Sequence, residues 1–224
     1  MNSSFASFEN EIKGRSGKEI RAYIRELRED MQAVKDMMEC PDGRGLEPRY
    51  DPTAELRLER DRECMKLCIR EIEENGAGYK PDKAERRAMA FQAELEHISK
   101  VSFSIGGFFE GTTEYCIEFC DEAIRCSFSS MFGDREDEKR CLTTMEGNHI
   151  LTKSEFIQYL SSLHMGEWLE EYYPERFGIA VCDGTQWEIR IEYDDGTGAA
   201  EFYGSNSYPY NFERFQYLFG LSFD

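Results

Sequence analysis

The spacing of apolar residues changes once along this chain of 224 residues, near residue 99, and the change limits the folds open to it. Before residue 99, apolar side chains recur every three or four residues, which is the period of an amphipathic helix. After it they alternate with polar side chains, which is the period of a half-buried strand. The sequence therefore predicts an α+β fold, with a helical region over residues 1–98 and an α+β domain over residues 99–224.

The helical region carries three helix signals. Ser16 and Glu19 form a capping box ahead of a seam of apolar residues at Ile20, Ile24, Leu27, Met31, Val34 and Met38. Asp51 and Pro52 fit the N-cap and first position of a second helix, which Asn75-Gly76 would end. A third helix follows, with apolar residues at Ala84, Ala88, Phe91, Leu95 and Ile98. We expect a helical bundle or an antiparallel hairpin.

The second half predicts an antiparallel sheet with two β-hairpins and helices on one face. Residues 113–129 read as one hairpin, and residues 133–140 as a solvated loop. Thr152 and Glu155 place a capping box before one broken helix or two short ones. The second hairpin, over residues 185–204, has alternating apolar residues in its first strand and Asp195-Gly196 as its tight turn.

The charge of the chain is strongly acidic and unevenly distributed. The formal net charge is −18; residues 1–100 carry 19 basic and 22 acidic side chains, whereas residues 101–224 carry 8 and 23. Direct binding of nucleic acid or of an anionic membrane requires clustered Lys and Arg, so both are disfavoured. A basic partner surface is the chemistry that this charge favours.

Eight cysteines are present, but their spacing completes no metal site. They are Cys40, Cys64, Cys68, Cys116, Cys120, Cys126, Cys141 and Cys182. Two pairs have C-x3-C spacing, yet the three histidines are too scattered to complete four zinc ligands. No apolar run approaches the roughly 20 residues that span a bilayer, and residues 1–15 do not resemble a secretory signal. We expect reduced thiols, no metal, no cofactor and a cytoplasmic protein.

Familiar catalytic signatures are missing from the sequence. There is no phosphate-binding G-x-x-x-x-G-K-[ST], no dinucleotide-binding G-x-G-x-x-G, no G-x-S-x-G and no H-E-x-x-H. A thiol enzyme would need Cys141 or Cys182 beside His149 or His164, in positive surroundings that this acidic half does not supply. The sequence predicts no catalytic residue.

The segment "YGSNSYPYNFERF", residues 203–215, has two readings. As a connector, Gly204 bends the chain, Asn206 adopts a left-handed conformation, Pro209 fixes the backbone and Asn211 caps a short helix. As a binding site, Tyr203, Tyr208 and Tyr210 form an aromatic platform, because tyrosine covers apolar area and offers a hydroxyl. The candidate binding residues are then Tyr203, Asn206, Tyr208 and Tyr210 with the strand carboxylates Glu188, Glu192 and Glu201.

Three motifs in the second half give a family resemblance. They are "SFSIGGFFEG", the D-G-x-x-W strand within "DGTQWEIRIEYDDG", and the G-S-N-x-Y-P-x-N-F segment within "YGSNSYPYNF". In these motifs the chain, over residues 99–220, resembles a group of uncharacterised α+β proteins of anaerobic Gram-positive bacteria. The resemblance implies the fold and no activity.

We therefore expect a non-enzymatic protein that binds a partner protein with a basic surface. A sharper version is an inhibitor that mimics nucleic acid and covers a nucleic-acid-binding surface. The alternatives are a small enzyme with an unrecognised site, or a structural module that oligomerises through its N-terminal helices.

Overall fold

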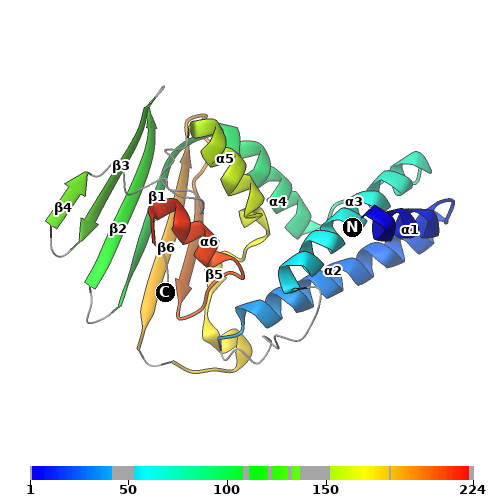
Figure 1. Cartoon of the computed structure of the whole chain (residues 1–224), viewed down its shortest axis with the longest axis horizontal. Helices are drawn as coiled ribbons and strands as arrows, with labels where there is room; N and C mark the ends of the chain where they lie inside the picture. Colours follow the sequence, from blue (N-terminus) through cyan, green and yellow to red (C-terminus); the bar gives the residue numbers. More distant parts are fainter. Residues whose placement is uncertain are drawn as a thin grey trace. The chain divides into compact units, whose positions relative to one another are not determined.

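The computed structural model describes residues 2–41, 53–107, 111–120, 123–130, 133–136, 152–181 and 183–221. The chain forms two compact units, Met1–Pro81 and Asp82–Asp224, whose elements are labelled in Figure 1. The fold class is α+β, with helices preceding the sheet, as predicted. The boundary between the two units lies at residue 82, whereas the first strand begins only at Ile98, so the second unit starts with helical residues.

The first unit consists of α1 (Asn2–Ile12), α2 (Gly17–Glu39) and α3 (Ala54–Glu74). The predicted Ser16–Glu19 capping box is present at the start of α2. The N-cap of α3 is Thr53, whose hydroxyl accepts the Leu56 N–H at 3.4 Å, and not Asp51, which lies outside the described residues. The three helices share one apolar core, formed by Ile12, Ile20, Ile24, Met65, Cys68 and Ile72.

The third predicted helix exists but does not join this bundle. It is α4 (Lys83–Glu94), continued by η1 (Leu95–His97), and Asp82 caps it. Its apolar residues Phe91 and Leu95 belong to the core of the second unit, where the Phe91 ring lies 6.0 Å from that of Phe202. The helical region of residues 1–98 is therefore divided between the two units, because the apolar face of α4 fits the sheet.

The second unit is built on a seven-stranded sheet of order β4-β3-β2-β1-β6-β7-β5. The strands are β1 (Ile98–Gly107), β2 (Gly111–Cys120), β3 (Ala123–Ser130), β4 (Gly133–Glu136), β5 (Glu171–Tyr172), β6 (Thr185–Tyr193) and β7 (Ala200–Ser205). Both predicted hairpins, β2–β3 and β6–β7, are confirmed. All neighbours pair antiparallel except β5 and β7, which are parallel.

Two local predictions in the sheet are wrong. Of the loop expected over residues 133–140, residues 133–136 form β4 and pair with Ser127–Ser130 of β3, because charged residues are compatible with an edge strand, while residues 137–140 lie outside the described part of the chain. The β6–β7 connection is no two-residue turn but spans residues 194–199. Only Gly196 there has a positive φ, of 86°, while the Asp195 carboxylate accepts the Thr197 N–H at 2.9 Å.

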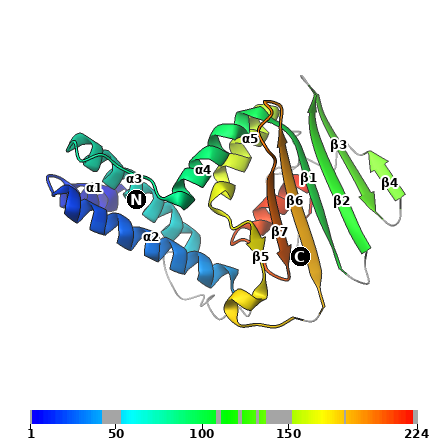
Figure 2. The same cartoon turned by 180° about the vertical axis from the view of Figure 1, so that it is seen from behind.

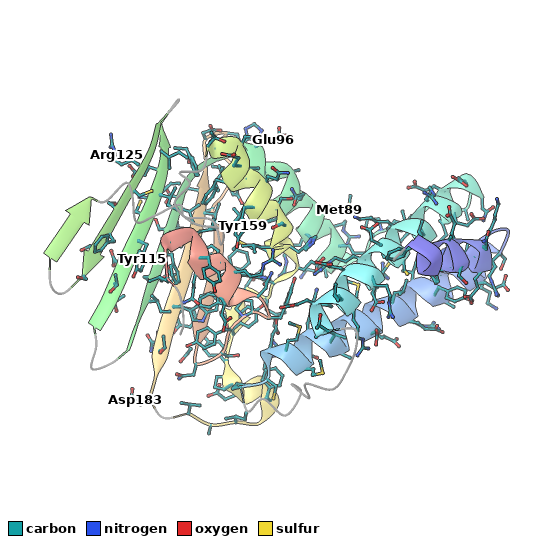
Figure 3. The ribbon with its side chains drawn as sticks, in the orientation of Figure 1. Met89, Glu96, Tyr115, Arg125, Tyr159 and Asp183 are labelled. Carbon is teal, nitrogen blue, oxygen red and sulfur yellow. The ribbon has the colours of Figure 1, made fainter. Side chains whose placement is uncertain are left out.

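Helices cover one face of the sheet, and apolar side chains fill the space between. The covering elements are α4, α5 (Lys153–Ser162), η2 (Met165–Glu167), α6 (Phe212–Gln216) and η4 (Tyr217–Phe219), while η3 (Pro174–Phe177) follows β5. In Figure 2, which views the sheet from behind, α6 lies beyond β6 and β7. Tyr159 of α5, labelled in Figure 3, donates to the Arg214 carbonyl at 2.9 Å and ties α5 to α6. No helix in the described parts of the chain has the length and apolarity needed to cross a membrane.

Trp187 of β6 lies directly against the backbone of β7 at Gly204. The two residues are register partners, and the indole is buried. A Cβ placed on Gly204 would lie 2.3 Å from two atoms of the ring, which is closer than side-chain carbons approach. Gly204, expected to bend the chain, instead stays within β7 and leaves room for the indole.

We expect Gly204→Ala to lower the free energy of unfolding by about 1–3 kcal/mol, because the added methyl group overpacks a buried ring. Gly107→Ala in β1 is the matched control, since a Cβ there meets its nearest atom at an ordinary 3.8 Å. Urea unfolding of both variants is the measurement. Equal stability of the two variants would contradict the close packing of Trp187.

Candidate functional site

In the connector after β7, Asn206 binds the backbone of Thr185 at the start of β6 through hydrogen bonds. Asn206 has the expected left-handed conformation, with φ 53°. Its N–H donates to the Thr185 carbonyl and its side-chain Oδ1 accepts the Thr185 N–H, both at 2.9 Å. Asn206 thus extends the β6–β7 pairing by one residue, which is a structural role.

Asn211 occupies the N-cap position of α6 but does not cap it. Its Oδ1 accepts the indole N–H of Trp168 at 2.9 Å, and its Nδ2 donates to the Leu163 carbonyl at 2.8 Å. The side chain makes no capping hydrogen bond. The predicted cap is therefore wrong, because Asn211 is the partner of two polar groups inside the unit.

The three tyrosines of the predicted platform do not gather on one face. Tyr208 and Tyr210 are half-buried and pack against the core. The Tyr208 ring stacks on Trp187 at 6.4 Å and lies 5.1 Å from Phe212, on the helix-covered side of the sheet. Tyr203 alternates with the buried Phe202 and Gly204 and therefore points to the opposite face.

Tyr203 shares that outer face with the three candidate carboxylates. Glu188 is its register partner on β6, and Glu201 is the partner of Arg190. Glu192 lies two residues after Arg190 in β6 and therefore points to the same outer face. The Tyr203 ring lies 5.8 Å from that of Tyr173, which is exposed. The structure thus brings together four of the seven candidate residues.

Arg190 partly neutralises this group. Its Nε donates to Glu192 at 2.9 Å, and its Nη1 donates to Glu201. The hydrogen bond to Glu192 and the charge of Glu201 raise the pKa of Arg190 above its usual value. All three side chains are well exposed, and exposed ion pairs of this kind contribute little to stability.

A pocket of about 710 Å³ lies beside β7 and is bordered by α4, η2, β5 and the β6–β7 connection. Five carboxylates line it: Glu94, Glu170, Glu171, Glu188 and Glu201. The one basic residue in its lining, Arg87, is ion-paired with Glu170 at 3.3 Å and also donates to the Trp168 carbonyl. We call this site the acidic pocket.

The acidic pocket also has aromatic walls, formed by Phe91, Tyr193, Phe202 and Tyr203. Tyr193 is half-buried, and burial, followed by the nearby carboxylates of Glu94 and Asp195, raises the pKa of its phenol to about 12. Thr197 closes one end, because its hydroxyl donates to Glu94 at 3.3 Å and to Asp195 at 2.9 Å. Carboxylates beside aromatic faces suit an organic cation such as a lysine or arginine side chain.

A second hollow, of about 600 Å³, lies on the outer face over β1, β2 and β3. Its polar lining is mostly serine, with Ser102, Ser104, Ser127 and Ser129. Its charged residues are two acidic, Glu114 and Glu188, and two basic, Lys100 and Arg190. Because these charges balance, this hollow favours no ligand of one sign, and the acidic pocket is the better candidate.

Within the described residues, the geometry offers no catalytic thiol and no metal centre. Burial raises the pKa of the Cys64 and Cys116 thiols, and that of Cys68 to about 12, which disfavours the thiolate form at these three positions. Cys141, Cys182 and His149 lie outside the described residues, so the expectation that they form no catalytic dyad stays a prediction. No cluster of three or more metal-ligating side chains occurs in the described parts.

Comparison of the chain with protein-family models, with curated proteins and with solved structures gave no match. The resemblance of residues 99–220 to a group of bacterial proteins therefore stays a prediction. The acidic pocket is therefore identified from its lining residues alone.

Sequence reasoning missed Glu94, Glu170, Glu171 and Tyr193. Glu94 lies more than 70 residues before the adjacent pair Glu170 and Glu171 in the sequence. They line one pocket because α4 and β5 both pack beside β7. No local pattern marks them, since isolated glutamates on a helix or near a turn are usually solvated. Tyr193 belongs to the alternating apolar residues of β6, and this alternation alone does not mark it as part of a site.

We expect Asn211→Ala to lower the free energy of unfolding by about 2–4 kcal/mol, because it leaves two buried polar groups without a partner. Gln158→Ala, which removes an exposed amide on α5, should change stability by less than about 0.5 kcal/mol. Thermal and urea unfolding measure both. A small loss for Asn211→Ala would show that Asn211 does not hold Trp168 and Leu163.

The raised pKa of Tyr193 makes stability depend on alkaline pH. The unfolded chain loses this proton near its ordinary pKa of 10, whereas the folded chain keeps it until about pH 12. The contribution of Tyr193 to the free energy of unfolding is therefore complete below pH 10 and is lost as the pH rises from 10 to 12. Tyr193→Phe should make the decline of stability over this range shallower than in the parent. Identical declines in urea midpoints would contradict the assignment.

Proposed function

We propose that the protein is a non-enzymatic, cytoplasmic interaction protein whose second unit binds a basic segment of a partner protein at the acidic pocket. The observation that supports this is the gathering of five carboxylates and one arginine around a concave site with aromatic walls. A basic segment at this edge of the sheet would lie beside carboxylates from α4, β5, β6 and β7.

The charge of the two units supports the same proposal. Residues 82–224 carry 27 acidic and 12 basic side chains, a net charge of −15, whereas residues 1–81 carry 18 and 15, a net charge of −3. The field of the second unit therefore attracts a basic partner from a distance and raises the rate of association. Aromatic contacts such as that of Tyr203 act on the rate of dissociation instead.

The concave arrangement favours entry of a basic segment over mimicry of nucleic acid. A mimic presents unpaired negative charges in rows on a protruding surface. On the outer face of this sheet, Arg190 is bound to Glu192 and Glu201, and Lys100 lies 3.8 Å from Glu118. Of the five carboxylates of the acidic pocket, Glu170 is paired with Arg87 and Glu201 with Arg190, which leaves Glu94, Glu171 and Glu188 in excess of basic partners among the described residues.

The test begins with capture and identification of partners from the native cell, with the purified protein as bait. Binding of the captured partner is then measured against a triple variant, Glu94→Gln, Glu170→Gln and Glu188→Gln. We expect a loss of affinity of at least about tenfold, because attraction within the pocket is removed. Affinity for the parent should also fall steeply with salt, since the Debye length shortens from about 10 Å at 0.1 M to about 3 Å at 1 M.

A matched triple variant separates the pocket from net charge. Glu96→Gln, Glu175→Gln and Glu213→Gln remove the same charge from exposed positions that do not line the acidic pocket, and Glu96 is labelled in Figure 3. This control should retain nearly full affinity. If both triple variants bind equally well, the acidic pocket is not the binding site.

A further inference from the structure

The edge of β7 that borders the acidic pocket is only partly paired. On one side β7 pairs with β6 from Ala200 to Ser205. On the other side β5 pairs with Tyr203 and Gly204 alone. Ala200, Glu201 and Phe202, which line the acidic pocket, therefore have no strand beside them on that side within the described residues.

The register shows which backbone groups point into this free edge. The Tyr203 N–H donates to the Glu170 carbonyl at 2.9 Å, so the polar backbone groups of Tyr203 face away from β6. In an antiparallel pair, this direction alternates from residue to residue. The N–H and C=O of Glu201, two residues earlier, therefore also face away from β6. No backbone hydrogen bond joins them to a described residue outside the β6–β7 pair.

We propose that this edge accepts an extended basic segment of the partner, which adds to the sheet as a short strand beside β7. Its main chain would exchange hydrogen bonds with Glu201, and its basic side chains would lie among the carboxylates of the acidic pocket. Adding a strand to an exposed sheet edge is a common way to bind peptides, in which the main chain gives affinity and the side chains give specificity. This inference rests on the proposed function and names the form of the partner.

The negative charge around the β7 edge favours a basic segment over a second copy of the chain. A basic segment is attracted by the five carboxylates, of which Glu94 is half-buried beside the walls of Phe91 and Tyr193. A second copy of the chain would bring a second unit of net charge −15 and would be repelled. A basic residue opposite Glu201 would project on the outer face, beside Glu201 and Tyr203, since side chains in register share a face.

Two variants at one position separate the backbone from the charge. Glu201→Gln removes the carboxylate and keeps the N–H. Glu201→Pro removes both, and because this N–H faces away from β6, no hydrogen bond of the β6–β7 pair is lost. The Glu201→Pro variant should fold, and if it does not, an amide-to-ester substitution at residue 201, made by semisynthesis, removes the N–H alone.

The probes are two synthetic decapeptides of equal charge, one alternating lysine with valine and one alternating lysine with proline. The lysine–valine peptide can adopt a regular strand and pair with an edge, whereas each proline removes an N–H and holds φ near −65°, which favours the polyproline II conformation over a strand. We expect the parent protein to bind the lysine–valine peptide at least about tenfold more tightly than the lysine–proline peptide. Glu201→Pro should abolish this preference, Glu201→Gln should keep it, and hydrogen exchange at the Glu201 amide should slow in the complex.

The outcomes distinguish the two proposals. If both peptides bind the parent equally and the pocket triple variant weakens both, charge recognition stands and strand addition is wrong. If Glu201→Pro and Glu201→Gln show the same preference for the lysine–valine peptide, strand addition is also wrong. If neither peptide binds the parent at about 1 mM in low salt, both proposals fail, because an open acidic edge should hold such a peptide at least that weakly.

Discussion

The contact between the Trp187 indole and the bare backbone of Gly204 fixes the centre of the second unit. The indole N–H also donates to the Ser207 carbonyl at 2.9 Å, which ties the connector after β7 to β6. The Phe212 ring of α6 lies 4.5 Å from the same indole, and the Tyr172 ring of β5 lies 5.8 Å from it. One side chain thereby positions the connector, the last helix and the strand that ends the sheet.

The acidic pocket is a consequence of this arrangement. Because α4 packs through Phe91 onto Phe202, and because β5 is only two residues long, part of the β7 edge stays open beneath α4. Long hydrophobic edges invite aggregation, and charges on an edge strand oppose it. The carboxylates on this edge oppose pairing with other copies of an acidic chain, and in the proposed function they also attract a basic segment.

The two units differ in net charge and in the composition of their cores. The first unit is close to neutral and holds together through an apolar seam between three helices. The second unit carries most of the net charge, the aromatic core and the acidic pocket. In the proposed function a basic partner would be guided to the second unit, where the ring of Tyr203 lines the acidic pocket and lies 5.8 Å from the exposed ring of Tyr173.

The sequence by itself determined the elements whose cause is local. The alternation in β6, the apolar seam of α2 and the capping boxes at Ser16 and Thr152 depend on neighbours a few residues away, so they could be read directly. The tertiary structure alone decided where α4 packs, why Asn211 serves Trp168 instead of α6, and which tyrosine faces outward. It also brought Glu94, Glu170 and Glu201 around one pocket. These features depend on contacts between residues far apart in the chain, and a side chain's local pattern does not specify which distant surface it will meet.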